Sequence, residues 1–219
     1  TGWYDGATLR VCDSPEIVWS QPGGEDSVRA ASDSMNVAMD HLSVQSVSLL
    51  SGARLQLSGL RKGIPYTQLI ESDSSEIRID KGRISLIKAF GSVRLSFLQE
   101  DIRIEIPADS VTAWLKEGQT DSLKAHGQVE GTYQSGSEKM SRVLGEVKTL
   151  WFERGELVKM HLLGNAACSY SSQAGDKGEN ADLSGDFLEL LFERGDLVRI
   201  EGSGSIEGVY IPQPVGGKP

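Results

Sequence analysis

The chain has 219 residues, a formal net charge of −9, 25 glycines and only 6% aromatic residues. This acidity argues against nucleic acid as a partner, because a phosphate backbone requires a basic stripe and the lysines and arginines form none in the sequence. No apolar run approaches the roughly 20 residues of a membrane helix, and Thr1 does not open a signal-peptide pattern. We therefore expect a soluble protein that is a mature or truncated sequence.

The first predicted elements are two short strands, over residues 6–11 and 17–19, which belong to a degenerate first unit within residues 3–30. Five better-defined units follow at intervals of 36 to 40 residues. In each unit an acidic anchor precedes a small residue by eighteen positions, in the pairs Asp33 and Ser51, Asp73 and Gly91, Asp109 and Gly127, Glu146 and Gly164, and Asp186 and Gly204. The clearest copy is Trp151 to Met160, which reappears as Leu191 to Ile200.

Within the units, the residues two, four and six positions after each anchor are mostly apolar. A period of two predicts strands with one apolar face and one solvated face. The predicted inward residues are Met35, Val37, Met39, Leu55, Leu57, Ile77, Ile79, Val93, Leu95, Phe97, Val111, Leu115, Tyr133, Leu150, Phe152, Tyr170, Leu188, Leu190, Phe192 and Tyr210.

Turns separate the alternating arms, as at residues 80–82 and 153–155, where glycine can adopt a positive φ. We therefore expect short antiparallel strands joined by hairpins. The predicted fold class is all-β, as one elongated repeat domain over 1–211. Its units are 31–59, 72–97, 107–133, 144–170 and 184–210, and a Pro/Gly-rich tail follows at 212–219. Stacked units of this kind present a long surface or groove, which makes a compact catalytic pocket less expected.

No metal, cofactor or catalytic group is predicted. His41, His126 and His161 lie in different units, without a second His or Cys at ligand spacing. The acidic anchors recur in every unit, so we interpret them as strand-start or turn residues that accept local backbone hydrogen bonds. The glycine-rich run 202–208 enters a strand rather than a helix and is interpreted as a turn.

The two cysteines, Cys12 and Cys168, lie several units apart, which is too far for a disulfide, so both are expected to be free thiols. Cys168 occupies an inward position and is interpreted as a small core residue. Trp114 and Trp151 fall on the outward face, as does Leu191. These tryptophans either pack under a loop or at a sheet corner, or they form a contact surface for a partner.

The repeated unit resembles the OstA-like (LptA-like) family of lipopolysaccharide-transport domains. The resemblance rests on the acidic anchor, the alternating strand, the Glu-Arg-Gly turn, the apolar strand and the ending Gly-x-apolar-x-x-x-Tyr, and it covers roughly residues 30–210. Members are the periplasmic bridge protein, its inner-membrane-anchored neighbour and the periplasmic part of the outer-membrane translocon. The chain departs from the family in longer insertions at 134–143 and 171–184.

The resemblance implies an open β-jellyroll of two facing antiparallel sheets whose interior carries the acyl chains of lipopolysaccharide. It implies a periplasmic lipopolysaccharide-binding and transport bridge protein, exported across the inner membrane, with the predicted inward residues lining the groove. Its partners would be lipopolysaccharide or a related lipid, and other jellyrolls of the bridge.

The ends of the stack favour a further expectation. The strands nearest Leu9 and Tyr210 are expected to be unpaired edges, which can pair head-to-tail with another jellyroll or with a second copy. Two other functions are weighed against the lipid bridge. A passive structural or adhesive β-solenoid would have a tightly packed interior, whereas a lipid carrier would leave a cavity between its sheets. A carbohydrate-active enzyme would need carboxylates gathered on one exposed face.

Overall fold

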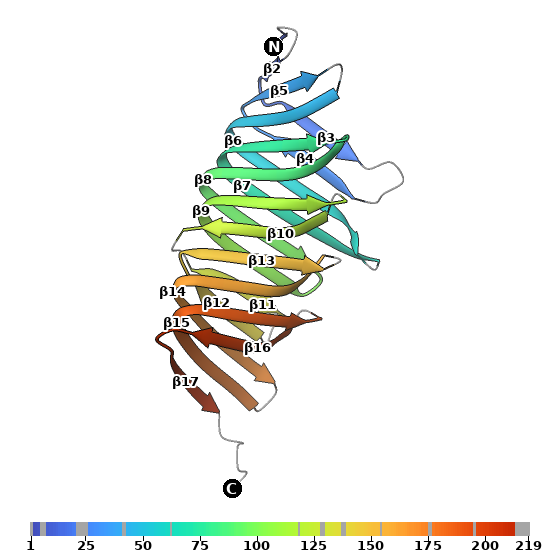
Figure 1. The fold of residues 1–219 in the computed structure, drawn as a ribbon. Helices are drawn as coiled ribbons and strands as arrows, with labels where there is room; N and C mark the ends of the chain where they lie inside the picture. Colours follow the sequence, from blue (N-terminus) through green and yellow to red (C-terminus); the bar gives the residue numbers. More distant parts are fainter. Residues whose placement is uncertain are drawn as a thin grey trace.

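The computed structural model describes residues 2–4, 8–20, 26–40, 43–61, 63–117, 119–127, 130–136, 139–153, 155–174, 177–194 and 196–212. Every regular element within these ranges is a strand (Figure 1). The strands are β1 (Gly2–Tyr4), β2 (Thr8–Cys12), β3 (Glu16–Ser20), β4 (Ser27–Ala31), β5 (Ser34–Asp40), β6 (Ser43–Arg61), β7 (Ile64–Asp80), β8 (Arg83–Gln99), β9 (Ile102–Lys116), β10 (Gln119–His126), β11 (Gly131–Ser135), β12 (Lys139–Leu144), β13 (Val147–Glu153), β14 (Glu156–Ala174), β15 (Lys177–Glu193), β16 (Asp196–Ser203) and β17 (Glu207–Pro212).

The strands form two facing sheets that share their longest members. The first sheet runs β1, β2, β5, the first half of β6, the second half of β7, the first half of β8, the second half of β9, β10, β13, the first half of β14, the second half of β15, and β16. The second sheet runs β3, β4, the other halves of β6 to β9, β11, β12, the other halves of β14 and β15, and β17. All pairings are antiparallel, and the sheets stack along one axis (Figure 1). The prediction of an all-β open jellyroll is confirmed.

One long side of the molecule, the spine, consists of the corners where the chain crosses from one sheet to the other. The ladder skips residues there, as between Glu71 and Ser74 on β7 and between Phe90 and Val93 on β8. Several corner residues have a positive φ, including Gly91 at 72° and Gly164 at 74°. The strands were predicted to be short, but β6 and β14 each have 19 residues because a bent strand keeps its alternation through the corner.

The five acidic anchors lie along this spine, each beside the small residue predicted eighteen positions later. A Cβ added at Gly91 would lie 2.2 Å from an Asp73 oxygen, and one added at Gly204 would lie 2.2 Å from an Asp186 oxygen. The hydroxyl of Ser51 donates to Asp33 Oδ2 at 2.8 Å. Asp33 and Glu146 do lie at strand starts, directly before β5 and β13, as predicted. For Asp73, Asp109 and Asp186 the interpretation was wrong, because these residues lie within long strands and their side chains lie beside the neighbouring strand at a sheet corner.

The opposite long side, the seam, is where the hairpins of the two sheets meet. The predicted turn at 80–82 is confirmed, with Lys81 at φ 50° and Gly82 at φ 75°. Gly155 also has a positive φ, 81°, while residue 154 lies outside the described residues. The two insertions are the hairpins β11–β12 and β14–β15 of the second sheet, so they lengthen hairpins without interrupting the stack.

Both ends of the chain join the stack. The predicted early strands are present as β2 and β3, although residues 5–7 lie outside the described part. The strand of Leu9 was predicted to be a free edge, and this was wrong, since β1 pairs with β2 through Trp3 and Arg10. At the other end, β16 and β17 are the last paired strands of their sheets among the described residues. The tail after Pro212 lies outside the described residues.

Candidate functional site

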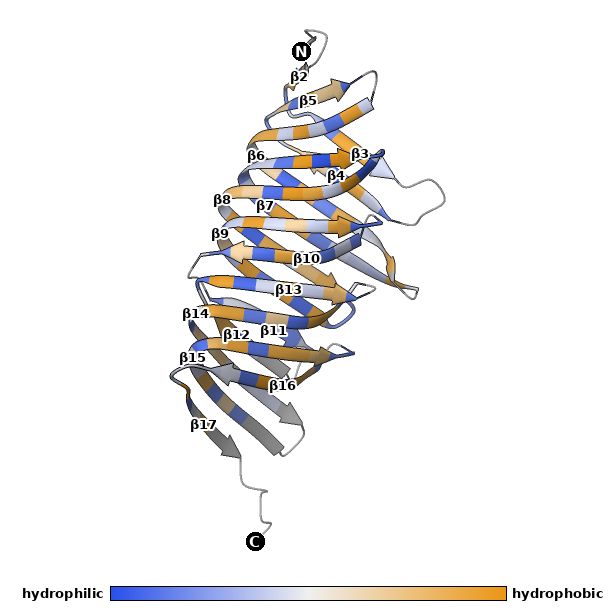
Figure 2. Ribbon diagram, in the orientation of Figure 1, coloured by the Kyte–Doolittle hydropathy of each residue, from blue (hydrophilic) through white to orange (hydrophobic). Residues whose placement is uncertain are grey.

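The space between the sheets is lined by apolar side chains along the whole stack. On the first sheet one cross-strand ladder passes, strand by strand, through Leu9, Val37, Val47, Ile77, Ile87, Ala113, Leu123, Leu150, Met160, Leu190 and Ile200. All of these are buried except the two ends, Leu9 and Ile200, which are partly buried. Figure 2 shows the corresponding alternation of hydrophobic and hydrophilic residues along the strands.

The second sheet supplies the facing wall. Its inward ladder contains Ala30, Leu55, Ile70 and Leu95, followed by Ile106 on β9. Across the gap, Phe97 of the second sheet packs against Phe152 of the first at 6.0 Å between ring centroids. Tyr133 and Phe192 make a similar pair at 4.8 Å. Side chains therefore fill the space between the sheets where these rings meet, and any guest there requires the sheets to part.

Nearly all of the predicted inward residues are in this interior. Met39 and Tyr170 are only partly buried, and the side chain of Tyr210 lies outside the described part; the others are buried.

The seam is bridged by polar side chains, and no backbone ladder among the described strands crosses it. Gln119 Nε2 on the first sheet donates to Asp26 Oδ2 beside the second sheet, at 3.2 Å. The buried hydroxyl of Thr120 donates to Gln68 Oε1 at 2.6 Å. Farther along, Ser135 Oγ donates to Asp196 Oδ1 at 3.1 Å. These three bridges hold the two rows of hairpins together.

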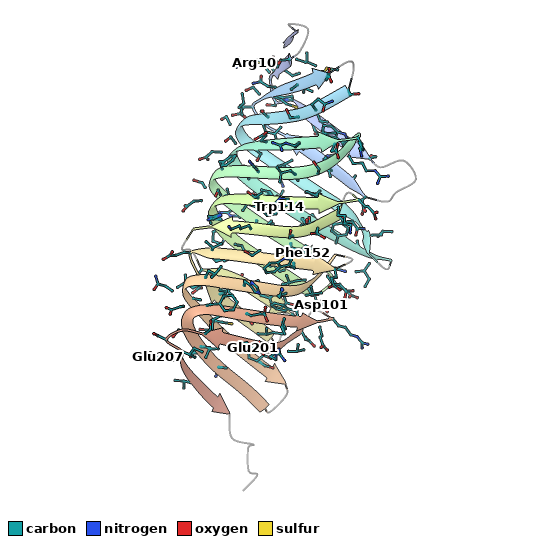
Figure 3. All side chains as sticks on the ribbon, viewed as in Figure 1. Arg10, Asp101, Trp114, Phe152, Glu201 and Glu207 are labelled. Carbon is teal, nitrogen blue, oxygen red and sulfur yellow. The ribbon has the colours of Figure 1, made fainter. Side chains whose placement is uncertain are left out.

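A cavity of about 440 Å³ lies at the seam, where the β9–β10 and β13–β14 hairpins diverge. Its lining combines polar residues of both hairpins with the ring of Phe152, which belongs to the interior (labelled in Figure 3). Thr120, one of the seam-bridging residues, is also in the lining. The cavity therefore connects solvent at the seam with the edge of the apolar interior.

Among the described residues, one charged side chain lies in the interior. Lys148 occupies an inward position between Ala125 and Leu162 and is fully buried. Its Nζ donates to the carbonyl oxygens of Gly127 at 2.9 Å and Gly145 at 2.7 Å, at the spine. Burial lowers the pKa of Lys148 from its ordinary 10.5, and the nearby Asp109 opposes that shift. The sequence pattern placed this residue inward among apolar ones but did not indicate its partners.

The C-terminal end of the interior is less covered than its middle. Leu183, Leu197 and Ile200 are only partly buried. A cavity of about 270 Å³ lies there, between the middle of β14, the middle of β15 and the start of β17. The apolar lining therefore continues to the end of the stack.

The other candidate residues are the two cysteines, the histidines and the glycine-rich run. Both cysteines are free thiols, as predicted, and burial raises the pKa of Cys168 to about 12, with Asp182 adding to the shift. His41 lies outside the described residues. His161 Nε2 donates to Glu189 Oε2 on the outer face of the first sheet. The glycine-rich run is a corner between β16 and β17, with Gly204 at φ 92°, which confirms the predicted turn.

The described residues contain no cluster of three or more His, Cys, Asp or Glu side chains suited to a metal ion. They also contain no helix of the length and apolar character needed to span a membrane.

No family model matches the sequence, and no curated protein sequence matches it. Among solved structures, the fold is similar to that of LptH from Pseudomonas aeruginosa, described as the LptA-homologous periplasmic component of the conserved lipopolysaccharide transport device. The TM-score is 0.46 and the sequence identity 12%, over 65% of this chain and 93% of that chain. The all-β jellyroll assignment follows from the strands and pairings themselves, and a similarity of this size adds nothing about function.

Proposed function

We propose that the chain is a periplasmic bridge protein that binds lipopolysaccharide, or a related multi-acyl lipid, with the acyl chains between its two sheets. The observation that carries the proposal is the apolar ladder from Leu9 to Ile200, which runs the length of the stack beneath a seam bridged by side chains. The resemblance of the repeated unit to OstA-like domains supports the same function.

Transfer free energies make such binding favourable. Each buried methylene contributes about 0.8 kcal/mol, so an acyl chain of about twelve carbons contributes roughly 10 kcal/mol before the cost of parting the sheets. Because equivalent ladder positions recur in every unit, no position along the stack holds a chain much more tightly than the next. Uniform affinity of this kind allows a lipid to move along the interior instead of remaining at one point.

The seam provides the route by which such a lipid would enter. A bulky, charged head group cannot follow the acyl chains into the apolar interior, because burial of unpaired charge is costly. It would remain at the seam, beside polar groups such as those that line the 440 Å³ cavity. The cavity over Phe152 is therefore our candidate for the place where the sheets first part.

Head-to-tail contacts are the second part of the proposal. The outer edges of β16 and β17 carry no partner strand among the described residues, so another jellyroll of the bridge, or a second copy, can extend both sheets there. Such an extension would make the apolar interior continuous between the two proteins.

The direct test is photo-crosslinking in cells that produce lipopolysaccharide. A photo-reactive residue at Leu190, which is buried in the ladder, is expected to capture the lipid. The same residue at the adjacent Glu189, which lies on the outer face, is expected not to. Equal capture at both positions would contradict a lipid between the sheets. Leu190→Arg should reduce lipid occupancy or prevent folding, because it places an unpaired charge in the interior.

A passive structural solenoid is the second candidate, and one observation favours it. The ring pairs Phe97–Phe152 and Tyr133–Phe192 fill the space between the sheets as a permanent core would. Native mass spectrometry of protein purified from a lipopolysaccharide-producing host separates the two functions. Co-purified lipid A species would support the bridge, while protein free of lipid under the same conditions would support the solenoid.

A further inference from the structure

The outer face of the first sheet carries three cross-strand rows that the proposed groove does not use. They span β8, β9, β10, β13, β14 and β15, and we call them together the tryptophan face. The row nearest the seam is Leu86, Trp114, Ser122, Trp151, Lys159 and Leu191; the middle row is Lys88, Thr112, Lys124, Thr149, His161 and Glu189; the row nearest the spine is Phe90, Ser110, His126, Val147, Leu163 and Phe187.

Several large apolar side chains on this face are exposed to solvent, although the solvent-facing side of a sheet is usually polar. Trp114 (labelled in Figure 3) is 42% exposed, Phe90 45% and Leu163 43%. With strands about 4.8 Å apart, six strands span about 24 Å, so the three rows form one continuous surface and not scattered residues. Contiguous apolar surface of this kind marks interaction sites. The sequence left open whether the tryptophans pack under a loop. Trp114 does not pack under one, because its side chain is exposed on the sheet face.

The aromatic part of the face is held in place before any partner arrives. Trp151 and His161 pack edge to face at 4.5 Å between ring centroids, and His161 packs against Phe187 at 5.0 Å. The ammonium of Lys159 lies 4.5 Å from the centre of the Trp151 ring. Ordered side chains lose little conformational freedom on binding, which favours association.

The charge of the face is opposite to that of the chain. Lys88, Lys124 and Lys159 lie on it, and its one carboxylate, Glu189, accepts a hydrogen bond from His161. No ion pair involves these lysines among the described residues, although Glu76 lies opposite Lys88 on β7. The outer face of the second sheet differs, because four of its arginines form ion pairs: Arg29 with Glu16, Arg54 with Glu71, Arg103 with Glu105 and Arg142 with Glu130. Arg94, exposed on the same face, has no ion pair among the described residues.

We propose that the tryptophan face docks the protein on an anionic membrane surface. Tryptophan is enriched at the membrane interface, where its ring is buried and its N–H remains hydrated. Unpaired lysines are attracted to anionic head groups, each by about fivefold in binding. This docking is separate from the groove, because it uses the opposite side of the same sheet, and it does not depend on the proposed function.

Other occupants fit the face less well. Bases of single-stranded nucleic acid stack on aromatic rings, but half of the apolar positions here are aliphatic: Leu86, Val147, Leu163 and Leu191. A second copy docked through the same face would place lysine rows opposite each other, and like charges in contact are unfavourable. A lipid surface accommodates both the aliphatic side chains and the lysines.

The test is co-sedimentation of the full chain with vesicles of phosphatidylglycerol or phosphatidylcholine. Wild-type protein is expected to bind phosphatidylglycerol vesicles, with a blue shift of tryptophan emission, and to leave phosphatidylcholine vesicles unbound. Lys88→Glu with Lys124→Glu should weaken binding by at least about 25-fold, from about fivefold for each lysine. Trp114→Ala should weaken it by roughly tenfold, through lost apolar burial.

The matched control is Arg54→Glu with Arg103→Glu, which makes the same change in charge on the outer face of the second sheet. This variant should bind vesicles within about twofold of the wild type, because screening limits the reach of a charge to about 8–10 Å. The proposal would be overturned if the control lost as much binding as the lysine variant, if the lysine variant bound fully, or if the wild type bound both lipids equally. It would also be overturned if the protein bound single-stranded DNA more strongly than vesicles. A Ser135→Cys, Asp196→Cys protein oxidised to close the seam should still bind vesicles, so failure of the groove and failure of the face give different results.

Discussion

The spine and the seam are the two long sides of one jellyroll, and they are closed by different means. At the spine the backbone itself crosses between the sheets, and each acidic anchor packs against a small residue of the next strand. At the seam the hairpins meet through side-chain hydrogen bonds such as Thr120 to Gln68 and Ser135 to Asp196. Separating the sheets at the spine would require unfolding, whereas separating them at the seam breaks side-chain hydrogen bonds and the ring contacts Phe97–Phe152 and Tyr133–Phe192 without breaking a backbone ladder.

This difference indicates where a guest can enter. A net contribution of about 1 kcal/mol is usual for one hydrogen bond in a folded protein, so the three described seam bridges together offset only a small part of the free energy gained by burying acyl chains.

The largest expected effect is at the spine, for Gly91→Ala. A Cβ there would lie 2.2 Å from an Asp73 oxygen, and the φ of 72° is itself unfavourable for alanine. We expect the free energy of unfolding to fall by about 3 kcal/mol, from steric overlap added to left-handed backbone strain. Urea denaturation monitored by circular dichroism measures it.

The matched control for that variant is Gly82→Ala at a hairpin of the seam. Gly82 has nearly the same φ, 75°, but no atom lies within 4 Å of its added Cβ. It should cost only about 1 to 2 kcal/mol, the backbone term alone. If the two variants lose equal stability, the close packing of acid and glycine contributes nothing to the spine.

The second prediction concerns Lys148, whose ammonium joins two carbonyls of the spine. Lys148→Met removes both hydrogen bonds while keeping the volume, and we expect a loss of about 2 kcal/mol at neutral pH, since two buried carbonyl groups lose a donor. Equilibrium unfolding of both proteins gives the difference.

The pH dependence sharpens this prediction. Because burial lowers the pKa of Lys148 below 10.5, the unfolded chain holds a proton that the folded protein has released, and the stability of the wild type rises as pH increases toward 10.5. The methionine variant lacks this gain, so the stability difference between the two proteins should widen with pH. A difference that narrows would show that the folded protein binds the proton more tightly than the unfolded chain.

The smallest effect is expected at the seam, for Thr120→Val. The substitution leaves the buried amide of Gln68 without the hydroxyl donor, which should cost about 1 kcal/mol. Thr120→Val with Gln68→Leu should recover most of that loss, because both polar partners are then absent. Additive losses in the double variant would mean that the two side chains stabilise the seam through other contacts.

The strands and the inward residues could be predicted from the sequence, because period-two alternation is a local property and the repeat multiplies it. The sheet corners could not be predicted from the sequence. A strand that bends at Gly91 keeps its period-two alternation on both sides of the bend, so the small anchor appears in the sequence as one more strand residue. The positions of the acidic anchors were visible in the sequence, but their contact with the residue eighteen positions later requires the pairing of two strands.

The polar parts of the site were harder to predict for a different reason. Gln119 meets Asp26 across 93 residues of sequence, and that contact depends on how the two sheets face each other along the seam. The burial of Lys148 depends on two carbonyls at corners of the spine, which no pattern of side chains reveals. Trp114 and Trp151 were placed on the outer face correctly because alternation alone decides it.

The most direct test of the account is to lock the seam. In a Ser135→Cys, Asp196→Cys protein that also carries the photo-crosslinker at Leu190, oxidation should join the two hairpins where Ser135 now donates to Asp196. We predict that the oxidised protein captures lipopolysaccharide at least about tenfold less than the same protein after reduction, because the sheets can no longer part. Equal capture by the oxidised and reduced proteins would contradict entry of the lipid through the seam.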